Sequence, residues 1–203
     1  MFKKISTILI ILCCSLTYTF ALTSSQSEIE AANSLWNRWI INNHSDNPWK
    51  YNLNDNVLRQ EIAAVARGVA GLDKKKICEN EFLDVSANLP NDWACNNIEV
   101  LVDNDLISKN KTFRPEENIT KSEAVAMLIK SIGFDFSYNP NGIWNWQEQV
   151  VLFASRNWLI ENFTDYNTDA TRWWVFKFAD STIKKDEEIK EQYKQWYYSD
   201  ETL

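Results

Sequence analysis

The sequence predicts an all-α protein, and three observations carry that prediction. Only four glycines and four prolines occur in 203 residues, whereas sandwiches and barrels built from many tight turns usually need more of both. Apolar residues recur at helical spacing in several stretches. Helix start and stop signals stand at the ends of these stretches. Apolar residues make up 45% of the chain, which is enough to build a folded core.

The first 21 residues have the pattern of an export signal. Lys3 and Lys4 precede a short apolar run over residues 5–16, and Thr19-Phe20-Ala21 places small residues where a signal peptidase cuts. Two alternatives are an uncleaved membrane anchor and a lipoprotein modified at Cys13 or Cys14. No later stretch has the 18 or more apolar residues of a membrane span. We therefore expect a signal peptide at 1–21 and no membrane span after its removal.

Cys78 and Cys95 remain after signal cleavage, and only one pairing is open to them. In an oxidising compartment a bridge between them closes a loop of about 17 residues, worth roughly 3 kcal/mol in the chain-entropy picture. The alternative is two buried free thiols. No further cysteine or nearby histidine completes a metal site, so we expect no metal and no cofactor.

The middle unit, residues 78–136, is the clearest. An extended entry at Phe82-Leu83-Asp84-Val85 precedes a helix expected from Trp93 to Ile107, and a loop ended by Pro115 follows. A second helix opens at Thr120-Lys121-Ser122-Glu123, which is a capping box in which threonine and glutamate satisfy each other's backbone amides. Gly133 is a natural stop for this helix.

Residues 28–75 and 143–182 repeat this order in degraded form. In residues 28–75 a helix opens at Val57-Leu58-Arg59 and runs to Gly71; in residues 143–182 one helix is expected from Trp146 to Ile160 and another from Thr171. Arg59, Lys121 and Arg172 thus take the same position in three units. Residues 183–203 alternate in charge and end on Gln195-Trp196-Tyr197-Tyr198, which predicts either an extra C-terminal helix with its aromatic end packed on the bundle or a frayed terminus.

The middle unit resembles one repeat of the S-layer homology family. The motifs that carry the resemblance are Phe82-Leu83-Asp84-Val85, Asp92-Trp93-Ala94, Ile98-Glu99, Leu106-Ile107, Thr112-Phe113-Arg114-Pro115 and Ile119-Thr120-Lys121-Ser122-Glu123-Ala124. Weaker likeness extends the match over most of residues 35–180. The resemblance implies three helix-loop-helix repeats in a pseudo-threefold bundle with grooves between them. It also implies a protein secreted to the bacterial cell surface and attached to cell-wall polysaccharide, often one that carries acidic ketal-pyruvate groups.

The family's basic groove residue carries over by position to Arg59, Lys121 and Arg172. Each would stand in the first turn of a helix, where free amides and a cation together suit an anion. The alternative is that these side chains extend into water or pair with Glu61 or Glu123. We expect the three positions to be exposed. We expect Arg172 to be the strongest candidate, because it combines a guanidinium fork with its neighbour Trp173.

The chain departs from the family pattern at three kinds of position. Lys121 stands where arginine is usual, Trp174 replaces the motif glutamate, and the glycine before the Leu-Ile pair is Trp39, Asp105 or Trp158. An ammonium lacks the two-pronged fork that suits a carboxylate.

The tryptophans fall into two expected groups. Trp36, Trp93, Trp144 and Trp146 stand where a helical core wants bulk, and core packing is the expectation for most of them. Trp173 is expected to line a groove, because exposed indoles suit the apolar faces of sugar rings.

Two classes of function remain. A net charge of -7 argues against a nucleic-acid partner. His44 is the single histidine, so a Ser-His-Asp or Cys-His centre is hard to build, and carboxylates such as Asp84, Asp92 and Glu99 are what any acidic protein offers. We expect a non-enzymatic module that binds an acidic envelope polysaccharide; the alternative is a scaffold that binds another envelope protein.

Overall fold

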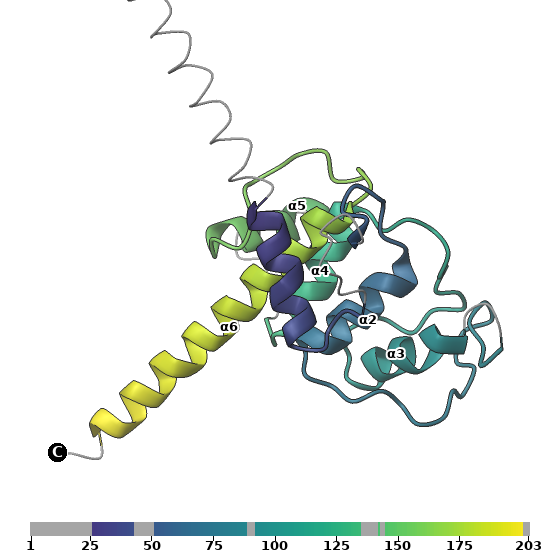
Figure 1. The fold of residues 1–203 in the computed structure, drawn as a ribbon, viewed down its shortest axis with the longest axis horizontal. Helices are drawn as coiled ribbons and strands as arrows, with labels where there is room; N and C mark the ends of the chain where they lie inside the picture. Colours follow the sequence, from purple (N-terminus) through teal and green to yellow (C-terminus); the bar gives the residue numbers. More distant parts are fainter. Residues whose placement is uncertain (1–25, 43–50, 89–91, 135–141, 143–144, 201–203) are drawn as a thin grey trace, which may run out of the picture.

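The computed structural model describes residues 26–42, 51–88, 92–134, 142 and 145–200, and in these residues the protein is all-α (Figure 1). A helical segment over residues 26–37 is followed by α2 (Arg59–Val69), α3 (Asp92–Asp103), α4 (Lys121–Ser131), α5 (Trp146–Arg156) and α6 (Arg172–Asp200). Across the described ranges the only extended pairings are isolated β-bridges. The predicted all-α class is confirmed. The predicted signal peptide, His44 and Trp144 lie outside the described residues.

The helix starts follow the sequence signals. Thr120 caps α4: its hydroxyl accepts from the amide of Glu123, whose carboxylate accepts from the amide of Thr120. At α2 the amide of Leu58 donates to the carboxylate of Glu61, which is one of the two hydrogen bonds of a capping box. The other hydrogen bond needs a side-chain oxygen at the N-cap, and leucine has none. Asn145 caps α5 through the amide of Gln147. The described part of the chain contains no helix that is both long and apolar enough to cross a membrane.

The entries of α2, α4 and α6 are joined by a closed ring of backbone hydrogen bonds. Val57 donates to Ala170, Ala170 donates to Ile119 and Ile119 donates to Val57, each at 2.9 Å. Isolated antiparallel bridges between the same segments flank this ring. These hydrogen bonds thus join three segments, each of which is more than 50 residues from the next along the chain. The finer prediction, that three whole repeats form a pseudo-threefold bundle with the boundaries given above, stays a prediction.

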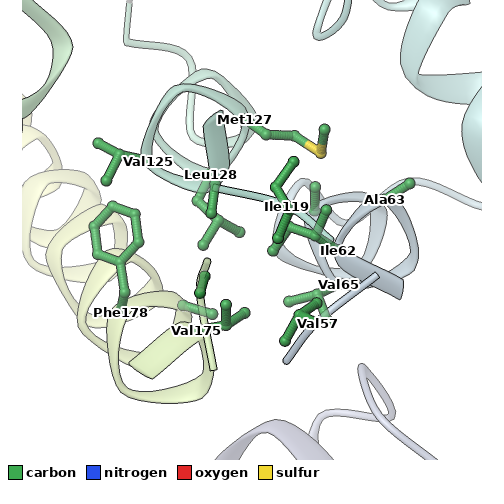
Figure 2. Close-up of a cluster of buried hydrophobic side chains, with 14 of the residues drawn as sticks. Val57, Ile62, Ala63, Val65, Ile119, Val125, Met127, Leu128, Val175 and Phe178 are labelled. Carbon is green, nitrogen blue, oxygen red and sulfur yellow. The ribbon is translucent and has the colours of Figure 1, made fainter. Parts of the chain in front are cut away.

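The same three helices share one apolar core (Figure 2). Ile62 and Val65 of α2 face Leu128 of α4, and Val175 and Phe178 of α6 close the cluster. All five are at most 5% exposed. Burial of aliphatic side chains at this level stabilises a fold by about 1.5–3 kcal/mol each. The core therefore ties α2, α4 and α6 together, and the first residues of these helices are the three basic ones.

The first helix of each unit ends in the same left-handed turn, although none of the three has glycine there. Trp39, Asp105 and Trp158 have φ angles of 59°, 57° and 61°. In each case the amide of the next residue donates back to the last helical turn: Ile40 to Leu35, Leu106 to Leu101 and Leu159 to Ala154. This is the Schellman closure, which normally favours glycine because a side chain is strained at positive φ. Trp39 and Trp158 are nevertheless 78% and 91% exposed.

Helix α6 is one continuous element of 29 residues, so the expected boundary at residues 182 and 183 lies inside it. Its C-terminal part extends away from the other helices (Figure 1), and Tyr193 is 69% exposed. Arg38, just after the first helical segment, forms a two-pronged ion pair with Glu187 of α6 at 2.7 and 3.2 Å. The aromatic end at Trp196 to Tyr198 lies outside the side chains that the structure describes.

Cys78 and Cys95 form a disulfide with their Cα atoms 5.7 Å apart, which confirms the predicted pairing. Cys95 is fully buried on α3. The bridge therefore fastens the loop before α3 to the inner face of this helix.

Candidate functional site

Two of the three basic residues form ion pairs with the motif glutamate of the next unit. Arg172 of α6 pairs with Glu61 of α2, and Arg59 of α2 pairs with Glu123 of α4 at 2.7 Å. Arg59 also donates through Nε to the carbonyl of Phe113 at 2.8 Å. The side chains of Arg59 and Arg172 are only 13% and 19% exposed. The expectation of exposed cations was wrong, and the alternative of pairing with Glu61 and Glu123 is what the structure has.

The third link in this series is different. Trp174 stands where a glutamate would meet Lys121, and Lys121 pairs instead with Asp165 of the loop before α6, at the longer distance of 3.4 Å. Its ammonium also lies 5.7 Å from the centre of the Phe163 ring. A hydrogen bond from Thr168, and to a smaller degree the charge of Lys121, lowers the pKa of Asp165. Lys121 is thus held by one exposed carboxylate and one aromatic face.

The amides of the first helical turns are used by the fold. The amides of Arg59, Lys121 and Arg172 donate to the carbonyls of Glu117, Thr168 and Asp55, at 2.8 to 2.9 Å. These bonds flank the backbone ring of Val57, Ile119 and Ala170. The expectation that helix amides and a cation share one anionic ligand was therefore wrong at these amides. These three amides are therefore not available to a ligand.

Each basic residue lines its own hollow. The Arg59 hollow has a volume of about 470 Å³ and includes Arg114, Glu123 and Trp146. The Lys121 hollow has about 620 Å³, and its other walls are Trp158, Trp173, Trp174, Lys177, Phe163 and Glu161, among others. The Arg172 hollow has about 340 Å³ and is largely apolar, with Ile40, Val65, Phe176 and Trp93 beside Glu61.

The structure separates Arg172 from Trp173, which were expected to act together. Although adjacent in sequence, they line different hollows: Arg172 faces the apolar one, and Trp173 lies with Lys121. Lys177, one turn further along α6, has its ammonium 5.9 Å from the centre of the Trp173 ring. Because successive helix residues point about 100° apart, one helix start supplies two hollows.

The core assignment of the tryptophans needs a correction. Trp93 and Trp146 are 44% and 47% exposed, and each lines a hollow. Trp36 is partly buried and lies with its ring centre 6.0 Å from that of Trp39. Helical spacing alone missed this because an amphipathic face also covers residues at its border. The exposed indoles of Trp39 and Trp158 were missed for another reason: they follow the helix, where periodicity no longer reports on burial.

Two of the three carboxylates considered for catalysis, those of Asp84 and Glu99, hold loops in place, and Asp92 lies in the first turn of α3. Asp84 accepts from the amides of Phe113 and Arg114 at 2.8 and 2.7 Å. Glu99 is fully buried and accepts from the amides of Glu79 and Glu81 at 2.8 and 3.0 Å. Each carboxylate accepts two backbone hydrogen bonds, which gives both groups a structural role.

Glu79, Glu81 and Glu99 also lie close enough together to suggest a cation site. The ammonium of Lys75 stands among them, 2.9, 3.1 and 3.7 Å from their oxygens. Hydrogen bonds from Lys109 first and Lys75 second lower the pKa of Glu81. A lysine therefore already supplies the positive charge that this cluster needs.

Comparison with known proteins supports the family resemblance. Residues 81–125 match the family model of the S-layer homology domain. The chain is also 25% identical over 142 residues to the Middle cell wall protein of Brevibacillus brevis, a match that covers 68% of this chain. The match spans only 13% of that relative's length.

Proposed function

The chain carries an S-layer homology domain, and from this premise we propose that it is an exported protein that holds itself to the bacterial cell wall by binding an acidic polysaccharide non-covalently. The domain and the cell-wall relative both support a cell-surface location. The observation that carries the proposal is the Lys121 hollow, in which two lysines and three tryptophans line one cavity. Ammonium groups suit the acid groups of such a polymer, and indoles suit its sugar rings.

The three basic residues are not equally available to a ligand. Arg59 and Arg172 are engaged by glutamates of the fold, so an incoming carboxylate has to displace or share an existing partner. Among the described residues, the ion pair of Lys121 is the longer one to Asp165, whose side chain is 55% exposed. Exchange of an exposed carboxylate costs little, because surface ion pairs contribute about 0–1 kcal/mol. We therefore assign the leading role to Lys121, with Arg59 and Arg172 as secondary contacts.

Because the chain has a net negative charge, its attraction to an acidic polysaccharide must act at short range. A net charge of -7 repels a polyanion at a distance, and beyond about 8 Å such charges are screened at physiological salt. Binding then depends on the local pocket. Its salt dependence should be shallow, since few counterions are released when few cations are used.

The test is a sedimentation assay with purified sacculi of the producing bacterium. Lys121→Met keeps the aliphatic stem and removes the charge, and we expect binding to weaken about tenfold, the value of one charge-assisted hydrogen bond. Lys190→Met is the matched control, because Lys190 is an exposed lysine on α6 that pairs with Asp186 of the same helix. Equal binding by the parent and Lys121→Met, both folded by circular dichroism, contradicts the proposal.

A second candidate is a scaffold that binds another envelope protein. The observation that favours it is the Arg172 hollow, whose walls are mostly aliphatic and aromatic. Sacculi stripped of acidic polysaccharide separate the two readings. Loss of binding after stripping supports the glycan, and retention on stripped but protein-containing walls supports the scaffold.

A further inference from the structure

We propose that reduction of the disulfide between Cys78 and Cys95 opens a site for Zn²⁺ or a chemically similar cation, held by the two sulfurs and the buried carboxylate of Glu99. The donor atoms of these three residues all lie within 4.8 Å of one another. Thiolates and carboxylates are both zinc ligands in proteins. The inference concerns α3 and the loop before it, and it does not depend on the proposed function.

Helix α3 brings two of the three ligands together in advance. Cys95 and Glu99 are four residues apart on this helix, so their side chains lie on one face, one turn apart. Both residues are fully buried, and a site built on a helix is more precise than one built on loops. The sequence has no third cysteine beside the pair and no nearby histidine. The fold supplies a buried carboxylate in their place.

The two oxygens of Glu99 have different surroundings. Oε2 accepts from the amide of Glu79 at 2.8 Å and lies 3.7 Å from the ammonium of Lys75. Oε1 accepts from the amide of Glu81 at 3.0 Å and lies 3.8 Å from Cys78 Sγ. A carboxylate oxygen has two lone pairs, so Oε1 keeps one for a metal. The backbone hydrogen bonds fix the carboxylate in one orientation, as the outer partners of metal ligands do.

The charges of this set balance with a divalent cation. Two thiolates carry two negative charges, which one Zn²⁺ cancels. The negative charge of Glu99 is already matched by the ammonium of Lys75. A site with two sulfur ligands selects zinc and similar metals over Ca²⁺ and Mg²⁺, which take oxygen ligands.

The loop can make the movement that a metal requires. The Cα atoms of Cys78 and Cys95 are 5.7 Å apart. With Zn–S distances of about 2.3 Å in a tetrahedral site, the two sulfurs stand about 3.8 Å apart, so they have to separate from bonding distance. Cys78 is half-buried on a loop and can supply this shift, whereas Cys95 is fully buried on α3. The side-chain oxygen of Asn80, 3.6 Å from Cys78 Sγ, or a water can fill the fourth position.

A balanced exchange connects the two states. A dithiol reductant transfers two electrons and two protons to the bridge, the S–S bond breaks, and the reductant is oxidised to its own disulfide. Zn²⁺ then displaces the two thiol protons to solvent as it binds both sulfurs. The loop before α3 thus stays fastened to the helix in both states, by a covalent bond in one and by a metal in the other.

The probe is Co²⁺, which takes the ligands of Zn²⁺ and whose bonds to thiolates absorb light. The purified parent chain, reduced with a phosphine and kept free of oxygen, should show thiolate–cobalt bands that saturate at one equivalent. Zn²⁺ should abolish these bands, and Ca²⁺ should leave them unchanged. The oxidised parent should show no bands. Zn²⁺ should also raise the urea midpoint of the reduced parent and leave that of the oxidised parent unchanged.

Glu99→Gln keeps the shape of the side chain and removes the charged ligand. We expect Co²⁺ to bind this variant at least about tenfold more weakly, since even the loss of an outer partner costs 10–100-fold. Glu79→Gln is the matched control, because the Glu79 side chain is 60% exposed and pairs with the same lysine but is not one of the three ligands. It should bind Co²⁺ like the parent. Cys78→Ala leaves one sulfur and should halve the band, and it provides the test where Glu99→Gln does not fold.

Three results overturn the inference. The first is a reduced parent that shows no thiolate bands, or shows them only when circular dichroism reports an unfolded chain. The second is equal Co²⁺ affinity of the parent and a folded Glu99→Gln, which means that the two cysteines bind without the carboxylate. The third is a Cys78→Ala variant with the full parental band. None of these results bears on the proposed function, which binding to sacculi tests separately.

Discussion

Single residues in this chain act in pairs that are far apart in sequence. Glu123 accepts from the amide of Thr120, from the guanidinium of Arg59 at 2.7 Å and from that of Arg114 at 3.3 Å. Glu123 therefore caps the N-terminus of α4 and also connects α4 to α2. Buried or half-buried groups with several partners are where single substitutions have large effects.

Glu123→Gln should lower the free energy of unfolding by about 1–3 kcal/mol, because the amide keeps the shape but loses the charge that both arginines face. The control is Glu117→Gln, since the Glu117 side chain is 58% exposed and forms an exposed ion pair with Arg114. That change should stay within about 0.5 kcal/mol. Urea denaturation of the two variants measures both values, and equal losses would contradict the special role of Glu123.

The residue-scale predictions from sequence succeeded where the interaction is local. The capping box at Thr120 spans three residues, and the left-handed stops at Gly71 and Gly133 follow from glycine itself. The sequence did not decide whether Arg59 and Arg172 pair with a glutamate or extend into water. The glutamates with which they pair are 64 and 111 positions away in the chain. Sequence spacing carries no information on which of two distant units supplies the partner.

At the scale of the helices, starts were predicted better than ends. The helix expected from Trp93 to Ile107 is α3 (Asp92–Asp103), and the one expected from Trp146 to Ile160 is α5 (Trp146–Arg156). The chain reverses at Asp105 and Trp158, and Leu106 and Leu159 then fold back on the last turn. Apolar spacing therefore continues past the end of each helix, and a non-glycine residue at the reversal hides the stop signal.

Helix α3 is fastened by the disulfide, and its removal tests that element. The double variant Cys78→Ala and Cys95→Ala should lose roughly 3 kcal/mol of unfolding free energy, since the bridge closes a sequence separation of 17 residues. Alanine is preferred because Cys95 is fully buried and serine would leave a hydroxyl there. Reductant should lower the denaturation midpoint of the parent and leave that of the variant unchanged; a midpoint of the parent that ignores reductant would contradict the prediction.

The whole molecule is held by contacts that the sequence pattern did not reveal. The ring of Val57, Ile119 and Ala170 and the shared core of α2, α4 and α6 join segments from all three units. The helices could be predicted from apolar spacing and capping residues. The ring that joins them consists of backbone hydrogen bonds, which do not depend on side-chain type, so the sequence pattern does not predict it. The same limit applies to the hollows, because their walls come from several segments at once.

The stability of the whole chain should fall at acid pH. The pKa values of Glu81 and Asp165 are lowered in the folded protein, the first mainly by hydrogen bonding to Lys109 and the second mainly by hydrogen bonding to Thr168. The unfolded chain then binds more protons, so the contribution of both groups is present above their ordinary pKa of about 4 and is lost below it. Unfolding free energies measured by urea from pH 7 down to pH 3 should be level at first and then decline. Glu81→Gln should make the decline shallower, and an unchanged slope would contradict the assignment.

The last prediction is that residues 78–136 do not fold alone, although they contain the whole segment that matches the S-layer homology domain. Ile119 donates to Val57 and accepts from Ala170, and both partners lie outside this segment. Leu128 packs on α2 and α6, so cutting them away exposes its side chain and that of Val125. A segment of about 60 residues buries too little surface to offset such losses, even with its disulfide intact. Circular dichroism of the oxidised segment should show little helix, whereas the chain from residue 26 onward should show full helix content and one cooperative urea transition. A segment with native helix content and its own sharp transition would mean that the middle unit is independent, and that the ring only docks units that are already formed.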